Sequence, residues 1–133
     1  MKKKAIVEMY EDGTYGIYVP EMACCALDGT GNSVQEAKDC MKEAYDEFVA
    51  YFKAQGEVPE ELSNLELEYK YDVASFLDAF DWINVTKFAK RAGINDSLMR
   101  RYKNGSAFAS EKQCNKIHQC AVNLAKELSA AML

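Results

Sequence analysis

Residues 85–105 are the most informative stretch of this 133-residue chain and read Val-Thr-Lys-Phe-Ala-Lys-Arg-Ala-Gly-Ile-Asn-Asp-Ser-Leu-Met-Arg-Arg-Tyr-Lys-Asn-Gly. Two helices that meet at a steep angle need a small residue at their contact and a residue that takes positive φ in the turn, with apolar residues on both sides. Ala89 and Gly93 fill the first two positions. The apolar positions are Phe88, Ile94, Met99 and Tyr102. The spacing predicts helices over 85–92 and 96–103 with a turn at Gly93.

This segment resembles the helix-turn-helix of phage repressors of the Cro/C1 kind. Asn95 is placed to cap the second helix, whose first turn would then face the major groove of DNA. Arg100 and Arg101 can donate paired hydrogen bonds to guanine. Asp96 can accept from a cytosine amino group, and Ser97 can donate or accept.

Other polar groups of the segment suit phosphate, which orients a protein on DNA without specifying sequence. These groups include the lysines and the amide of Gly105. The candidate DNA-binding residues are Thr86, Lys87, Lys90, Asn95, Asp96, Ser97, Arg100, Arg101, Lys103 and Asn104. A helical hairpin that binds no DNA is the alternative interpretation.

The net charge of -5 is divided unequally along the chain. Residues 1–72 carry 7 Lys or Arg against 16 Asp or Glu, a balance of -9, whereas residues 73–133 carry 9 against 5, a balance of +4. We therefore predict two domains, 1–72 and 73–133. A basic domain suits a polyanion and an acidic domain suits a basic partner, although a solvated charged face explains either one.

The first domain has the pattern of a small sheet with one long helix. Strands are predicted over 5–10 and 14–19 around the turn Glu11-Asp12-Gly13, followed by a third strand over 23–27 and a loop over 28–32 with two glycines. Ser33 and Glu36 form a capping box that opens a helix reaching about Gln55, and residues 65–71 alternate as a half-buried strand.

The order is thus β-β-β-α-β, followed by short helices over 73–82, 85–92 and 96–103 and a longer helix over 111–130 capped by Ser110. The predicted fold class is α+β, with an all-α C-terminal domain.

The N-terminal half is similar to HicB antitoxins. The similarity rests on Asp12-Gly13, on Tyr15-Gly16-Ile17-Tyr18-Val19-Pro20-Glu21-Met22, on the cysteines that follow, and on Gly31-Asn32-Ser33-Val34-Gln35-Glu36-Ala37. The chain departs from the family at Ala23-Cys24, where Pro-Gly is common. The resemblance implies a partial, degenerate RNase H-like domain followed by a DNA-binding module, which Gly93 and its surroundings identify as helix-turn-helix.

The resemblance also implies a function in two parts. The acidic domain would bind and occlude a small basic HicA-type toxin, an mRNA-cleaving ribonuclease, and the C-terminal domain would repress the operon. The candidate toxin-binding residues form one acidic helix face, which can also be merely solvated: Glu36, Asp39, Glu43 and Glu47. The second hypothesis is a solitary transcription regulator whose N-terminal domain senses a ligand or dimerises.

Enzymatic activity is not predicted. The acids Glu8, Glu11, Asp12 and Asp28 lack the strand-centred spacing of a two-metal site, and His118 has no partner that sequence identifies. The five cysteines are odd in number and contain no C-x-x-C, so we expect buried thiols, with Cys24 and Cys25 packed in a strand. No metal or cofactor is expected.

No apolar run approaches the roughly 18 to 20 residues that a membrane helix needs, and Met1-Lys2-Lys3-Lys4 is not followed by an apolar signal core. We expect a cytoplasmic protein without a membrane partner. Ile117, Ala121, Leu124 and Leu128 form an apolar stripe that is either core or a subunit contact. Because symmetric operators are read by dimers, we expect a homodimer or a larger homo-oligomer.

Overall fold

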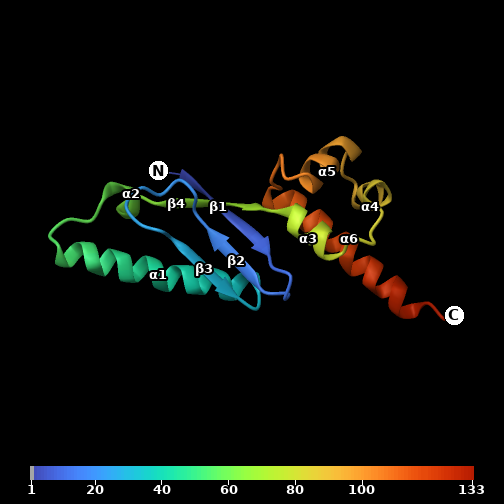
Figure 1. Ribbon diagram of the computed structural model, residues 1–133, viewed down its shortest axis with the longest axis horizontal. Helices are drawn as coiled ribbons and strands as arrows, with labels where there is room; N and C mark the ends of the chain where they lie inside the picture. Colours follow the sequence, from blue (N-terminus) through green and yellow to red (C-terminus); the bar gives the residue numbers. More distant parts are fainter. Residues whose placement is uncertain (1) are drawn as a thin grey trace. The chain divides into compact units, whose positions relative to one another are not determined.

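The computed structural model describes residues 2–133 and divides the chain into two compact units, Met1–Lys70 and Tyr71–Leu133 (Figure 1). The described residues contain a four-stranded mixed sheet and six helices. This mixed content agrees with the predicted α+β class. The sequence pattern and the charge change at Asp72, close to the division between the units.

The sheet of the N-terminal unit has the strand order β3-β2-β1-β4. Its strands are β1 (Lys2–Met9), β2 (Tyr15–Tyr18), β3 (Asp28–Gly31) and β4 (Glu66–Tyr71). β1 and β2 are antiparallel, with Val7 opposite Ile17. The predicted hairpin is confirmed: Gly13 has a φ of 84°, and the Asp12 carboxylate accepts hydrogen bonds from the Thr14 amide (2.9 Å) and hydroxyl (2.6 Å).

The predicted third strand was wrong in position. Residues 23–27 are irregular, and the strand is instead Asp28–Gly31, within the segment predicted as a loop. β3 pairs antiparallel with β2, with Gly29 opposite Ile17. A Cβ on Gly29 would lie 2.4 Å from the Ala37 carbonyl oxygen, and one on Gly31 would lie 2.5 Å from the Glu36 Cβ. These glycines therefore serve close packing of a helix on a strand and not a chain reversal.

The helix above this strand is α1 (Val34–Ala54), which packs on β3 and β2. The predicted capping box is present, because the Ser33 hydroxyl accepts from the Glu36 amide at 3.1 Å and the Glu36 carboxylate accepts from the Asn32 amide at 2.9 Å. The apolar residues of α1 that repeat at spacings of three and four are buried or half-buried: Val34, Ala37, Met41, Ala44, Tyr45, Phe48 and Phe52. The core of the unit consists of Ala5, Ile6, Val7, Ile17, Val19, Leu27, Ala37, Met41 and Leu62.

A short helix that the sequence did not predict, α2 (Glu60–Ser63), holds the connection between β2 and β3. Its Leu62 is fully buried. The Glu61 carboxylate accepts a hydrogen bond from the Ala23 amide at 2.6 Å and pairs with the Lys3 ammonium at 3.4 Å. The Ala23 amide, with a smaller contribution from Lys3, lowers the pKa of Glu61. Three segments distant in sequence meet at this carboxylate.

The C-terminal unit contains α3 (Val73–Ala79), α4 (Val85–Ala92), α5 (Asp96–Lys103) and α6 (Glu111–Ala130). Each begins at a polar residue whose side chain accepts from a backbone amide of the first turn, namely Asp72, Asn84, Asn95 and Ser110. The predicted helices over 85–92, 96–103 and 111–130 are confirmed. α3 ends at Ala79 instead of 82, because Ile83 donates to the Phe80 carbonyl at 3.0 Å and the chain turns there.

One hydrophobic core joins the four helices: Val73, Leu77, Phe88, Ala89, Ile94, Met99, Tyr102, Ala109, Ile117 and Cys120. The stripe on α6 divides between two environments. Ile117 belongs to this core, whereas Leu128 is 57% exposed.

The cysteines differ from the prediction of buried thiols. Only Cys120 is buried, Cys40 is exposed, and the other three are half-buried. Cys24 and Cys25 lie in the β2–β3 connection and not in a strand, with their sulfur atoms 3.5 Å apart. Burial, assisted by Cys24, raises the pKa of Cys25 to about 12. Burial likewise raises the pKa of Cys114 to about 11.

Candidate functional site

The turn between α4 and α5 is built by local chemistry. Gly93 ends α4 in the left-handed region, with φ 73° and ψ 33°, and no heavy atom lies within 4 Å of a Cβ added there. The Ile94 amide then donates to the Ala89 carbonyl at 3.0 Å. This combination is a helix C-terminus closed by a left-handed glycine. Ala89 is fully buried, so its small side chain permits the close packing of α4.

The predicted DNA-binding residues gather on the outer surface of α4, α5 and the adjoining turns. All are exposed except Asp96, which is half-buried. The apolar residues predicted to bracket the turn are buried instead. One segment thus presents its polar residues outward while its apolar residues fill the core.

The two arginines of α5 are not equivalent. The Arg100 guanidinium forms an ion pair with the Asp96 carboxylate one turn earlier on the same helix. Among residues 2–133, Arg101 has no carboxylate within salt-bridge distance, and its side chain is exposed. Arg101 is therefore available to an incoming ligand, whereas Arg100 and Asp96 must first separate. Sequence alone treats both arginines alike.

Two of the predicted DNA-binding residues, Asn95 and Ser97, bond to each other in the cap of α5. The Asn95 Oδ1 accepts from the Ser97 amide at 2.9 Å and from the Ser97 hydroxyl at 2.6 Å. The Ser97 proton is thus committed, which leaves its oxygen as an acceptor and the Asn95 amide nitrogen as a donor.

A similar turn follows α5 and corrects one assignment. The Gly105 amide, predicted to be placed for phosphate, donates to the Tyr102 carbonyl at 3.2 Å. The Asn104 Oδ1 accepts from the Ser106 amide at 2.9 Å, so its side-chain nitrogen is the group left to donate outward. Within residues 2–133, Lys87, Lys90 and Lys103 have no carboxylate within salt-bridge distance, and all three are exposed.

An ion pair that the sequence does not predict lies between α4 and α6. The Arg91 guanidinium pairs with the Glu127 carboxylate, 36 residues away. No sequence spacing signals this contact, because it depends on how α6 crosses α4. Arg91 therefore supports packing and is the least available of the α4 cations.

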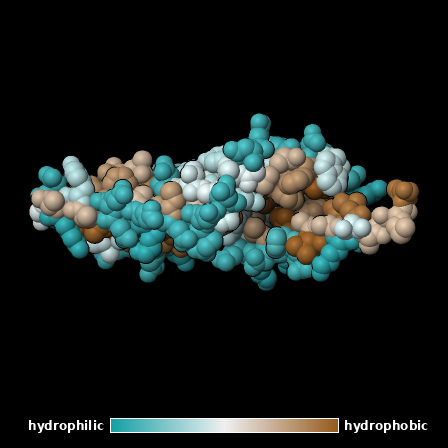
Figure 2. Space-filling model, turned by 90° about the horizontal axis from the view of Figure 1, so that it is seen from below, coloured by the Kyte–Doolittle hydropathy of each residue, from teal (hydrophilic) through white to brown (hydrophobic). Residues whose placement is uncertain are grey.

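The predicted acidic face lies on α1 in the other unit, where Figure 2 shows a mainly hydrophilic surface. Three of its four residues, Glu36, Asp39 and Glu43, line a shallow hollow of ≈ 450 Å³ together with Thr14, Thr30 and Asn32. Glu36 accepts from Asn32, and Asp39 accepts from the Gln35 amide at 3.0 Å. Glu47 lies outside the hollow, one turn further along the exposed side of α1.

Within residues 2–133, no group of three or more His, Cys, Asp or Glu side chains is arranged to hold a metal ion. Of the acids weighed for nuclease chemistry, Asp12 is committed to its turn, where the bonds from Thr14 lower its pKa. His118 is exposed on α6. In the same part of the chain, no helix is long and apolar enough to cross a membrane.

Comparison with known proteins gives no match: no protein-family profile, no curated protein and no solved structure resembles this chain at a significant level.

Proposed function

We propose that this protein is a HicB-type antitoxin, in which the N-terminal unit occludes a HicA-type mRNA-cleaving toxin and the C-terminal unit represses the operon through a helix-turn-helix. The observation that carries the proposal is the exposed polar surface of α4 and α5, supported by the left-handed Gly93 and by a buried apolar core.

The electrostatics support the DNA-binding part. Residues 73–133 carry a balance of +4, and Lys87, Lys90, Arg101 and Lys103 on or beside the turn extend into solvent. Backbone phosphates supply most of the affinity in protein–DNA binding. Arg101 is our principal candidate for base recognition, because it needs no rearrangement to donate its two hydrogen bonds.

The N-terminal unit supports the toxin-binding part. Its element order is β1, β2, β3, α1 and β4, with the short α2 before β4, and this agrees with the β-β-β-α-β order that the sequence pattern predicts. The acidic exposed side of α1 suits a basic partner. Glu43 and Glu47 are the sharper candidates there, because the Glu36 carboxylate is engaged in capping α1.

The proposal includes assembly into a homodimer or a larger homo-oligomer in the cytoplasm, since two half-sites of a symmetric operator require two recognition helices. Sedimentation across micromolar concentrations tests this part, and a monomer throughout would contradict it.

The decisive experiment measures both activities with one purified protein. We expect binding to DNA from the protein's own promoter, together with retention of a small basic protein encoded beside its gene. Glu43→Gln combined with Glu47→Gln should weaken toxin retention and leave DNA binding unchanged, and Glu57→Gln is the matched control. Failure of both activities would overturn the proposal, and DNA binding without a toxin would favour a solitary regulator.

A further inference from the structure

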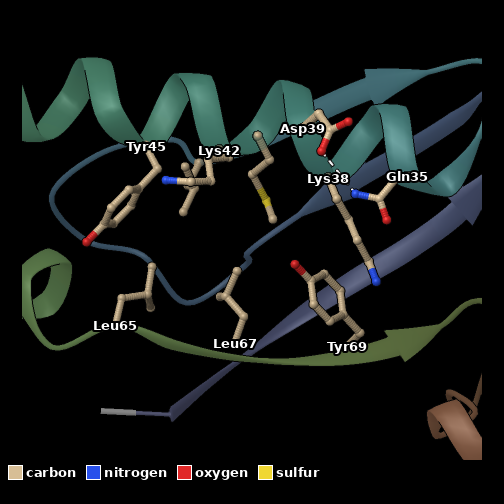
Figure 3. Close-up of a pocket in the computed structure, with 10 residues that line it drawn as sticks. Gln35, Lys38, Asp39, Lys42, Tyr45, Leu65, Leu67 and Tyr69 are labelled. Carbon is tan, nitrogen blue, oxygen red and sulfur yellow. Dashed lines mark hydrogen bonds between the residues drawn. The ribbon is translucent and has the colours of Figure 1, made fainter.

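A groove runs along the N-terminal unit between α1 and β4, which forms the edge of the sheet opposite β3 (Figure 3). It follows from how α1 is seated. Gly29 and Gly31 lack a Cβ and so allow the helix to approach β3 closely. β4 is the strand at the opposite edge of the sheet. The space that remains between α1 and β4 has a volume of ≈ 440 Å³. Pockets for small molecules in proteins have volumes of about 300 to 1,000 Å³.

The floor and one wall of the groove are apolar. Leu27 and Met41 form part of the lining and are almost fully buried, at 2% and 3% exposure. Figure 3 shows Leu67 and Tyr69 of β4, and Leu65 just before this strand, extending toward the helix. One end is held in place by the Tyr45 hydroxyl, which donates to the Leu62 carbonyl at 2.8 Å. An occupant would therefore bury an apolar body here.

The opposite wall carries positive charge in an otherwise acidic unit. Lys38 and Lys42 lie one turn apart on α1, and both line the groove. The Lys38 ammonium lies 4.1 Å from the centre of the Tyr69 ring, and no carboxylate of residues 2–133 is within salt-bridge distance of it. Lys42 pairs with Asp46 at 3.3 Å, but both side chains are largely exposed, so this bridge is weak.

One acid, Asp39, also lies on the rim. Its carboxylate accepts from the Gln35 side-chain amide at 3.0 Å, as Figure 3 shows. Asp39 is thus engaged by Gln35 and Lys42 by Asp46, which leaves the Lys38 ammonium as the charge in the lining that can pair with an anion.

We propose that this groove binds a small organic anion, with its apolar body against β4 and its carboxylate, sulfonate or phosphate at the Lys38 ammonium. A neutral apolar ligand would leave the Lys38 ammonium without an anionic partner, and a hydrophilic anion would leave the apolar wall unused. The proposal rests on the groove alone and stands independently of the proposed antitoxin function.

The test uses the full chain and a matched pair of dyes. The anion 8-anilinonaphthalene-1-sulfonate is expected to bind one site, with methyl shifts of Leu65 and Leu67 in NMR spectra. N-phenyl-1-naphthylamine, which has the same aromatic body without the sulfonate, should bind about tenfold more weakly, as expected for loss of one charge-assisted contact. Lys38→Met should weaken the anionic dye by about the same factor and leave the neutral dye unchanged.

Lys53→Met is the control, because it removes the same charge from an exposed position on α1 outside the groove. Equal affinities for the two dyes, or shifts confined to the C-terminal unit, would overturn the proposal. So would an apparent affinity that falls as the protein concentration rises, since that would mean that a second copy of the chain fills the groove.

Discussion

In the N-terminal unit, Gly29 and Gly31 lie beneath α1, where an added Cβ would come within 2.4 and 2.5 Å of helix atoms. In the C-terminal unit, Gly93 has open space around it, and what it supplies is a φ of 73°. Gly29 and Gly31 are needed because α1, a separate element of the fold, packs directly on them. Gly93 is needed only for the backbone conformation of its own turn. Glycine therefore has a different structural role in each unit.

The polar side chains show the same difference. The helices of the C-terminal unit begin at Asp72, Asn84, Asn95 and Ser110, each bonded to an amide two or three residues later. In the N-terminal unit, Glu61 instead joins Ala23 and Lys3, which are 38 and 58 residues away. The C-terminal unit is specified mainly by local interactions, and the N-terminal unit depends more on long-range ones.

The largest expected effect comes from Gly29→Ala. Its new Cβ would meet backbone atoms of α1 that cannot rotate away, so the free energy of unfolding of the N-terminal unit should fall by about 3 kcal/mol. Amide hydrogen exchange separates the units: protection should drop in α1, β2 and β3 and persist in α4 and α5. Thr30→Ala, at an exposed position of the same strand, is the control. Equal loss of protection in both units would mean that the stability of the C-terminal unit also depends on the packing of α1 on Gly29.

The next effect concerns the DNA binding that we propose for the C-terminal unit. Arg101→Ala should weaken binding to the operator by about 1 to 3 kcal/mol and relax sequence preference. Lys103→Ala should weaken specific and random DNA alike and reduce the salt dependence. Titrations by fluorescence anisotropy at several salt concentrations distinguish the two. If Arg101→Ala caused equal losses on operator and random DNA, the base-reading role of Arg101 would be wrong.

A smaller effect is expected from Gly93→Ala. The substitution meets no neighbouring atom, so its cost is only the left-handed backbone of a residue with a Cβ, about 1 kcal/mol. Gly93→Asn should cost less, because asparagine tolerates this conformation. Hydrogen exchange of the α4 and α5 amides measures both. A loss as large as that of Gly29→Ala would mean that Gly93 also serves close packing.

The smallest effect is the acid response of Glu61. Hydrogen bonding from Ala23 lowers its pKa in the folded chain, so the ionised group contributes stability above the ordinary glutamate range. This contribution is lost as the pH falls through the lowered pKa. The chemical shift of the Ala23 amide should titrate with a midpoint below that of an ordinary glutamate, and Glu61→Gln should abolish the titration. A midpoint at or above the ordinary value would mean that the contact is absent in solution.

Much of the candidate DNA-binding surface was predictable. The bounds of α4 and α5, the Asn95 cap and the left-handed Gly93 follow from signals within a few residues of one another. The commitment of Arg100 to Asp96 and the use of the Gly105 amide in its own turn were not foreseen, although both are local contacts. They depend on rotamers and turn geometry that residue types leave open.

By itself, the sequence determined the order of the helices and strands apart from α2, the hairpin at Asp12-Gly13 and the caps Ser33, Asn95 and Ser110, because each depends on a backbone preference or a bond between near neighbours. Only the tertiary structure decided that residues 28–31 form the third strand, that Glu61 holds Ala23, and that a cationic groove opens between α1 and β4. These features arise where segments far apart in the chain meet, and short-range periodicity carries no information about such encounters.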